Sequence, residues 1–265
     1  MAGLTMSSKV ASLLPSSRRR GMLAGMAKPL AKLLSMLTPK RRWAQFSLAT
    51  MLAVVTVLCV WLSVVVNRAH RQRDAVAAIV ALGGKVVYEQ PDTANEALPR
   101  RFLRRWLPRD YFDEVGWVNL DGIQIPGAGL AHLQGLTSLR RLDLGGALVT
   151  DAGLAHLQGL TALQRLSLHN TRVGDAGLAH LQGLTALKLL GLNNTQVNDA
   201  GLAHLKGLLG LRKLYLFSTR VTDAGLAHLK GLTALEVLLL DGTQVTDVGV
   251  AQLRKTLPNC NISGP

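Results

Sequence analysis

The chain is 265 residues long and 48% hydrophobic, which is ample for a folded core. Its formal net charge is +14, yet the first 67 residues hold nine Lys and Arg and no acidic residue, whereas residues 115–265 hold twelve basic and nine acidic residues. The part expected to fold is therefore only mildly basic, which argues against a nucleic-acid-binding protein. Cys59 and Cys260 are predicted to lie in separate parts of the fold, so we expect no disulfide between them.

Residues 1–45 form a basic, serine-containing and acid-free tail that we expect to be largely disordered. Within it, Met22–Leu37 mixes leucine and methionine with Lys28 and Lys32. This composition fits a short amphipathic helix lying on an anionic membrane surface, although Pro29 argues against one continuous helix. An unstructured basic tail explains the same segment equally well.

A long apolar segment follows the tail. Phe46–Val66 is 21 residues without a charge, and as a helix it would be about 31 Å long, enough to cross the hydrocarbon core of a bilayer. Its length and its apolar character on every side argue against a buried core helix. The preceding tail is too long for a cleaved signal peptide, and no small-residue cleavage pattern follows, so we predict an uncleaved signal anchor.

Basic residues flank this predicted transmembrane helix on both sides. Those on the N-terminal side extend back to Lys9, and the nearest are Lys32, Lys40, Arg41 and Arg42. Because positive charge tends to stay in the cytoplasm, the larger N-terminal excess predicts a cytoplasmic N-terminus and an extracytoplasmic C-terminal part. Arg68, Arg71 and Arg73 on the other side leave the opposite orientation open.

Residues 68–114 contain several short predicted elements. Arg68–Leu82 has apolar residues at helical spacing, Gly83 and Gly84 end that helix, and Lys85–Gln90 has the composition of a strand. Residues 91–99 are predicted to form a loop. A second helix is then indicated by the spacing of Phe102, Leu103, Trp106 and Leu107 before Pro108. We predict that residues 68–114 cover the N-terminal end of the repeats that follow.

From Val115 onward the sequence repeats every 24 residues. The motif GLAHL recurs in register, and an L-x-x-L-x-L stretch precedes each copy. The last two leucines of that stretch alternate with other residues, as in a strand with one buried face. Each strand should lead into a short helix that an aspartate caps and that a left-handed glycine ends. These predicted caps are Asp151, Asp175, Asp199, Asp223 and Asp247, and the glycines are Gly135, Gly159, Gly183, Gly207 and Gly231.

This pattern resembles the leucine-rich repeat family from Val115 to the C-terminus. The resemblance implies an α/β solenoid with a parallel concave sheet and short convex helices over residues 115–265, closed by a half-repeat at 257–265 and preceded by one transmembrane helix. Many members carry Asn after the strand. This chain is similar to the variant T-x-V-T-D-A-G-L, with Thr171, Thr195, Thr219 and Thr243 there, so the asparagine ladder cannot be transferred. The stretch RRWAQFSLATML from Arg41, followed by NRAHRQRDAVAAIVALGG ending at Gly84, also resembles the layout of bacterial single-pass membrane-anchored leucine-rich-repeat proteins.

Sequence variation within the repeats concentrates at the positions predicted to face the concave side. Solenoids commonly bind partners along that side, and aromatic and arginine residues commonly anchor interfaces. The candidate partner-binding residues are Tyr215, Phe217, Lys213, Leu239, Arg165, Arg141, Trp117 and His169. Drift at unpacked positions would produce the same variation without a binding function.

We find no catalytic motif, and we expect neither an enzyme nor a cofactor. The histidine of each GLAHL motif recurs every 24 residues, but no Cys or carboxylate accompanies it at ligand spacing, so we expect no metal site. The sequence therefore favours a membrane-anchored protein-interaction module that binds a protein or surface ligand. Two alternatives are a cytoplasm-facing membrane adaptor and a structural envelope spacer without a specific ligand.

Overall fold

The computed structural model describes residues 48–89, 113–125 and 127–264. The chain divides into two compact units, Met1–Trp61 and Leu62–Pro265. The predicted tail, its Met22–Leu37 segment, the loop at 91–99 and the helix around Phe102–Leu107 lie outside the described residues. So do Phe46 and Ser47 at the start of the predicted membrane segment.

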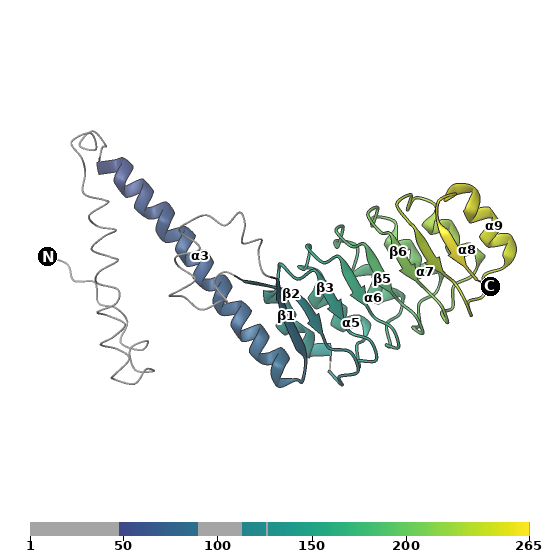
Figure 1. The fold of residues 1–265 in the computed structure, drawn as a ribbon, viewed down its shortest axis with the longest axis horizontal. Helices are drawn as coiled ribbons and strands as arrows, with labels where there is room; N and C mark the ends of the chain where they lie inside the picture. Colours follow the sequence, from purple (N-terminus) through teal and green to yellow (C-terminus); the bar gives the residue numbers. More distant parts are fainter. Residues whose placement is uncertain (1–47, 90–112, 126, 265) are drawn as a thin grey trace. The chain divides into compact units, whose positions relative to one another are not determined.

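The first described element is α3, a helix that runs without interruption over Leu48–Ala81. The sequence predicts a membrane helix ending at Val66 and a second helix from Arg68, whereas the structure has one helix through both segments (Figure 1). No proline or glycine lies between Leu48 and Ala81, so nothing in the backbone chemistry breaks the helix there. It ends just before Gly83, which has a φ of 88°.

The N-terminal part of α3 exposes apolar side chains on all sides. Thr50–Ala81 is long and apolar enough to cross a membrane, with a mean hydropathy of 2.2 in its best window and none of that window buried. The large apolar side chains from Met51 to Val64 are between 53% and 69% exposed. Exposed apolar surfaces of this extent commonly face a membrane or another protein.

The C-terminal part of α3 belongs to the second unit and covers the first repeat. Ala69, Gln72, Ala75 and Ile79 lie on one helical face and are buried. The Gln72 amide donates a hydrogen bond to the Asp113 carbonyl oxygen at 2.8 Å. Strand β1, Lys85–Glu89, then pairs antiparallel with the first repeat strand, β2, so helix and strand together cover the N-terminal leucines.

The second unit contains one eight-stranded sheet in which the strands follow chain order. All neighbours from β2 onward pair parallel, and the repeat length places equivalent residues side by side. The strands are β2 Glu114–Asn119, β3 Arg141–Asp143, β4 Arg165–Ser167, β5 Leu189–Gly191, β6 Lys213–Tyr215, β7 Val237–Leu239 and β8 Asn261–Ser263.

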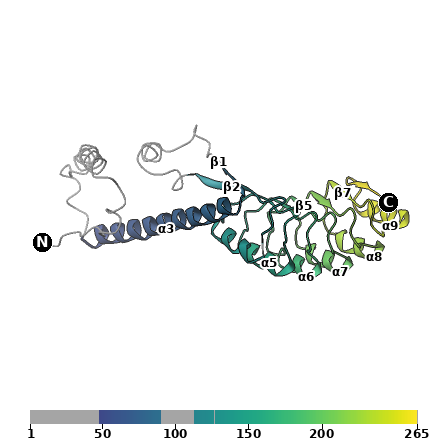
Figure 2. The ribbon, with the colours of Figure 1, turned by 90° about the horizontal axis from the view of Figure 1, so that it is seen from below.

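Short helices lie on the opposite side of the repeats from the strands (Figure 2). Three of the repeats have one α-helical turn followed by one 3₁₀ turn, which suits leucines spaced by three residues. The parallel sheet with helices on its other side is the α/β arrangement expected from the sequence. The helices are η3 Gly127–Gly135, α5 Asp151–Leu154, η4 Ala155–Leu157, α6 Asp175–Ala179, α7 Asp199–Leu202, η5 Ala203–Leu205, α8 Asp223–Leu226, η6 Ala227–Leu229 and α9 Asp247–Thr256.

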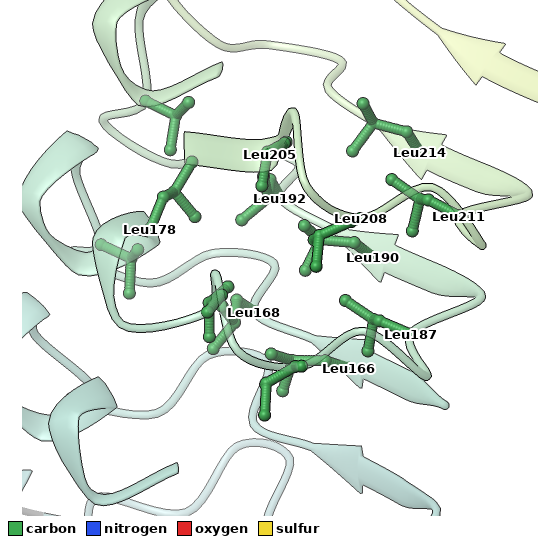
Figure 3. Packing of buried hydrophobic residues seen from close by; sticks show 14 of the residues in the cluster. Leu166, Leu168, Leu178, Leu187, Leu190, Leu192, Leu205, Leu208, Leu211 and Leu214 are labelled. Atoms are coloured by element: carbon green, nitrogen blue, oxygen red, sulfur yellow. The ribbon is translucent and has the colours of Figure 1, made fainter. Parts of the chain in front are cut away.

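The core between strands and helices is a stack of leucines. Leu166, Leu190 and Leu214 come from neighbouring strands and are fully buried beside helix leucines such as Leu178 and Leu205 (Figure 3). Burying one such side chain contributes about 1.5–3 kcal/mol. Each repeat is too thin to surround its own leucines, so its stability depends on contact with its neighbours.

The repeat aspartates hold neighbouring repeats together, and the predicted capping role is wrong. The residue before each aspartate is the N-cap, and the side chains of Asn198, Thr222 and Thr246 accept the helix N–H groups. Each aspartate instead accepts a hydrogen bond from the N-cap N–H of the next repeat, 23 residues later, at 2.7–2.8 Å. The acceptors are Asp151, Asp175, Asp199 and Asp223.

The glycines after the helices are also not the left-handed residues that the sequence predicts. The left-handed position comes instead directly after each strand, where φ is 56° at Asn170, 53° at Asn194 and 55° at Ser218. Glycine holds the equivalent position in three other repeats, at Gly122, Gly146 and Gly242. Asparagine tolerates this conformation better than most residues, so the tight turn after the strand selects Gly or Asn.

The repeat threonines satisfy the backbone within their own repeat. Thr171, Thr195 and Thr219 are buried, and each hydroxyl donates to the carbonyl oxygen three residues earlier at 2.6 Å. A threonine at this position therefore satisfies a strand-end carbonyl locally and makes no ladder between repeats.

We predict that Gly201→Ala destabilises the solenoid by about 1–3 kcal/mol, because a methyl group there would collide with Oδ1 of Asp175 and with Leu178. Gly207→Ala is the matched control, since no atom lies within 4 Å of its added methyl group. The control should be neutral or stabilising by up to about 1 kcal/mol. Urea unfolding of the full chain in detergent, followed by far-UV circular dichroism, measures both. Equal effects of the two substitutions would contradict close packing at the aspartate.

The equivalent contact of Asp223 makes the stability of the fold depend on pH. The hydroxyl and the backbone N–H of Thr246 bond to Asp223 and hold the pKa of its carboxyl below the ordinary 3.8. Because the folded-state pKa is lowered, this stabilisation is complete above the unfolded pKa and is lost as pH falls through the folded one. Thr246→Val should therefore reduce stability most at neutral pH, and its deficit should shrink below pH 3.8.

The control for this titration is Thr243→Val, which removes a hydroxyl bonded at 2.6 Å to the Leu240 carbonyl oxygen and to no titratable group. The loss in free energy of unfolding caused by Thr243→Val should be the same at every pH. If the Thr246→Val deficit is equally flat when free energies of unfolding are compared at each pH, the carboxylate does not respond to Thr246.

Candidate functional site

The side of the sheet away from the leucine core carries the variable side chains, and we call it the sheet face. Strand register aligns its residues in rows, so that Trp117, Arg141, Arg165, Leu189, Lys213 and Val237 form one row across the strands. A second row contains Asn119, Asp143, Ser167, Gly191, Tyr215 and Leu239. A third follows each strand end at Asp121, Gly145, His169, Asn193, Phe217 and Asp241.

The C-terminal half of the sheet face carries an apolar patch, which consists of Tyr215, Phe217 and Leu239. Phe217 is 38% exposed, and Tyr215 and Leu239 are half-buried. Tyr215 and Leu239 are register partners on adjacent strands. Lys213 borders the patch on β6, is exposed, and makes no side-chain hydrogen bond or ion pair with a described residue. The patch therefore presents two aromatic rings beside an ammonium group that no described residue pairs with.

The N-terminal half carries a hydrogen-bonded cluster, which we call the Trp117 cluster, made of Trp117, Arg141 and Asp143. The guanidinium carbon of Arg141 lies 4.6 Å from the centre of the Trp117 ring, a cation–π contact. Oδ2 of Asp143 accepts hydrogen bonds from the Trp117 indole N–H at 2.7 Å and from Nε of Arg141 at 3.0 Å. These contacts fix the position of the Arg141 side chain.

A depression of about 330 Å³ lies beside this cluster. Arg165 lines it together with Arg141 and Trp117, and its other lining residues are Val87, Glu89, Gly116, Arg140 and Gln164. Arg140 forms an ion pair with Glu89 at 2.9 Å. Arg165 is exposed, and its side chain makes no hydrogen bond or ion pair with a described residue.

His169 contacts Asp121 and belongs to neither the apolar patch nor the Trp117 cluster. Its Nε2 lies 3.3 Å from Oδ1 of Asp121, two repeats away. Gly145 occupies the intervening repeat, and a methyl group there would collide with both His169 and Asp121. The glycine therefore makes room for a contact that skips one repeat, and His169 is committed to that contact.

The structure thus places seven of the eight predicted residues in two separate regions of the sheet face, and His169 belongs to neither, since it contacts Asp121. Tyr215, Phe217, Leu239 and Lys213 lie together, and Trp117, Arg141 and Arg165 lie together. Sequence analysis missed Asp143 as the residue that orients Trp117 and Arg141. The available signal was its position in the variable row, since a carboxylate two residues after an arginine on a strand lies on the same face.

The histidines of the GLAHL motif make contacts between repeats on the helix side. Nδ1 of His156, His180 and His204 lies 2.7–2.9 Å from the side-chain amide nitrogen of a glutamine in the preceding repeat. Among the described residues, no group of three or more His, Cys, Asp or Glu has the geometry of a metal site.

The sequence matches neither a protein-family model nor a curated protein. Among solved structures, an internalin (inlF) from Listeria monocytogenes aligns with a TM-score of 0.47 and 23% identity, over 56% of this chain and 39% of that one. An internalin C2 (inlC2) from the same organism aligns with a TM-score of 0.48 and 20% identity, over 71% of this chain and 80% of that one. The chain thus spans well under half of the first internalin, and likenesses at these identities concern the fold alone.

Proposed function

We propose that the protein is a membrane-anchored interaction module that docks a protein partner on its sheet face. The observation that carries the proposal is the apolar patch. Tyr215 and Phe217 present aromatic surface on a face whose row neighbours are mostly polar or small, and such rings are frequent energetic anchors of interfaces. The proposed action is docking without chemistry, so catalytic residues and a cofactor have no part in it.

The proposed anchor is the apolar part of α3. Between Met51 and Val64 the large apolar side chains are exposed around the helix, and this distribution suits lipid better than water. The proposed topology places the N-terminus in the cytoplasm and the repeats outside, because the basic residues that directly precede the span (Lys32, Lys40, Arg41 and Arg42) outnumber those that directly follow it (Arg68, Arg71 and Arg73).

We predict that a photoreactive amino acid in place of Lys213 forms one defined covalent adduct in cells, because that side chain borders the apolar patch. The yield of this adduct should fall at least about tenfold when Tyr215 and Phe217 are both changed to Ala, as expected for two interface anchors. Gel shift and mass spectrometry of the adduct measure the yield and identify the partner. Unchanged urea unfolding of the double variant confirms that the loss is local.

The control position for crosslinking is Ala176, which is exposed on α6, on the helix side. A photoreactive residue there should give no adduct of the same mass. If Lys213 and Ala176 yield the same diffuse products, and the double alanine variant changes nothing, the sheet face has no specific partner. That outcome would support the alternative of a structural envelope spacer.

Topology is tested with single cysteines in a Cys59→Ser background, where Cys260 is buried. We predict that a membrane-impermeant maleimide labels Ala176→Cys in intact spheroplasts, and labels Ser8→Cys only after permeabilisation. The reverse pattern would support a cytoplasm-facing adaptor. Recovery of the chain in the soluble fraction, with both cysteines accessible after lysis, would contradict membrane anchoring.

A further inference from the structure

We infer that the depression beside Arg165 is a carboxylate-binding subsite, and that it fixes where the docked partner lies along the sheet face. The partner segment would place an Asp or Glu side chain between Arg141 and Arg165 and an aromatic or aliphatic side chain on the apolar patch. This inference rests on the proposed function and specifies the partner chemistry that the sheet face recognises.

Two of the three arginines that line the depression are paired with carboxylates, and the third, Arg165, is not paired with a described residue. Arg140 is paired with Glu89 at 2.9 Å, and Arg141 is paired with Asp143 at 3.0 Å. Arg165 has no described partner, yet it is the register neighbour of Arg141 on the adjacent strand. Like charges directly opposite one another destabilise a sheet, so a carboxylate bound between the two guanidinium groups would relieve this repulsion.

The Arg141 side chain is held in place before a ligand binds. The Trp117 ring and the Asp143 carboxylate hold Arg141 from two directions, so little side-chain freedom is lost when it binds an anion. Arg165 is free to complete the contact, and a guanidinium group presents paired donors that match a carboxylate. Gln164 and Trp117 give the depression both polar and apolar walls.

The distance between the subsite and the apolar patch suits a short extended peptide. Arg165 lies on β4 and Tyr215 on β6, two strand spacings apart and one row further along. With about 4.8 Å between strands and about 3.3 Å per residue along them, the two residues are about 12 Å apart. An extended peptide covers this distance in three to four residues, so the preferred motif has an acidic residue three or four positions from an apolar one.

The experiment is selection of a randomised twelve-residue peptide library, displayed on phage, against the full chain in detergent micelles. We expect enrichment of peptides with Asp or Glu three or four residues from Phe, Tyr, Leu or Ile, in either chain direction. Against Arg165→Glu, the acidic position should change to Lys or Arg while the apolar position is kept. Fluorescence polarisation of a selected peptide should show at least about a tenfold loss of affinity with Arg165→Gln.

The matched control is Arg172→Gln, which removes the same charge from an exposed arginine of the same repeat outside the three rows of the sheet face. It should leave the selected motif and its affinity unchanged. An equal loss with Arg172→Gln would mean that overall positive charge attracts the peptides, which contradicts a localised subsite.

Three negative outcomes bear differently on this inference and on the function on which it rests. Enrichment of apolar residues alone, unaffected by Arg165→Glu but lost in the Tyr215→Ala, Phe217→Ala variant, overturns the carboxylate subsite and supports docking. Peptides that bind that double variant as well as they bind the natural chain count against both the subsite and the docking face. Failure to enrich any peptide overturns the predicted linear motif, and the Lys213 crosslink then decides the docking function independently.

Discussion

The structure depends on burial of leucines that belong to different repeats. Leu166 and Leu190 are fully buried only because equivalent strands lie on either side of them. The aspartate bonds reinforce this arrangement, since each links a repeat to the N-cap of the next at a fixed separation of 23 residues. Leucine burial supplies most of the stabilisation, whereas the aspartates fix the register in which neighbours pack. Together they hold the sheet face in place without constraining its side chains.

That freedom explains how two chemically different regions lie on one short sheet. Within the Trp117 cluster, Asp143 accepts hydrogen bonds from Trp117 and Arg141. Arg165 beside the cluster has no partner among the described residues. The apolar patch lies further along the same face, and Gly191 between them is small and buried. No backbone feature requires an arginine at 165 or a phenylalanine at 217, since the equivalent positions in other repeats include Trp117 and Leu189 for the first and Asp121 and Asn193 for the second. These individual side chains therefore determine what the sheet face can bind.

Periodicity was sufficient to predict the parallel strands, the short helices and the rows of the sheet face, because each follows from a local and repeated pattern. It failed where a residue acts on a neighbouring repeat. Asp175 stands at the start of a helix and so has the sequence signature of a cap, but its partner Asn198 lies in the next repeat. The unbroken α3 was missed because a change from apolar to charged residues does not itself end a helix. Asp143 and Gly145 depend on contacts across strands, which spacing along one chain does not display.

The uniform step of the aspartate bonds has an evolutionary consequence. Excision or duplication of one whole 24-residue unit, for example residues 173–196, would leave every remaining aspartate opposite an N-cap and every leucine in its layer. Such recombination would alter only the gap between Arg165 and Tyr215, by one strand spacing of about 4.8 Å. Gain or loss of one unit would therefore change the length of ligand that fits between the two binding regions. The side chains of both regions would stay the same.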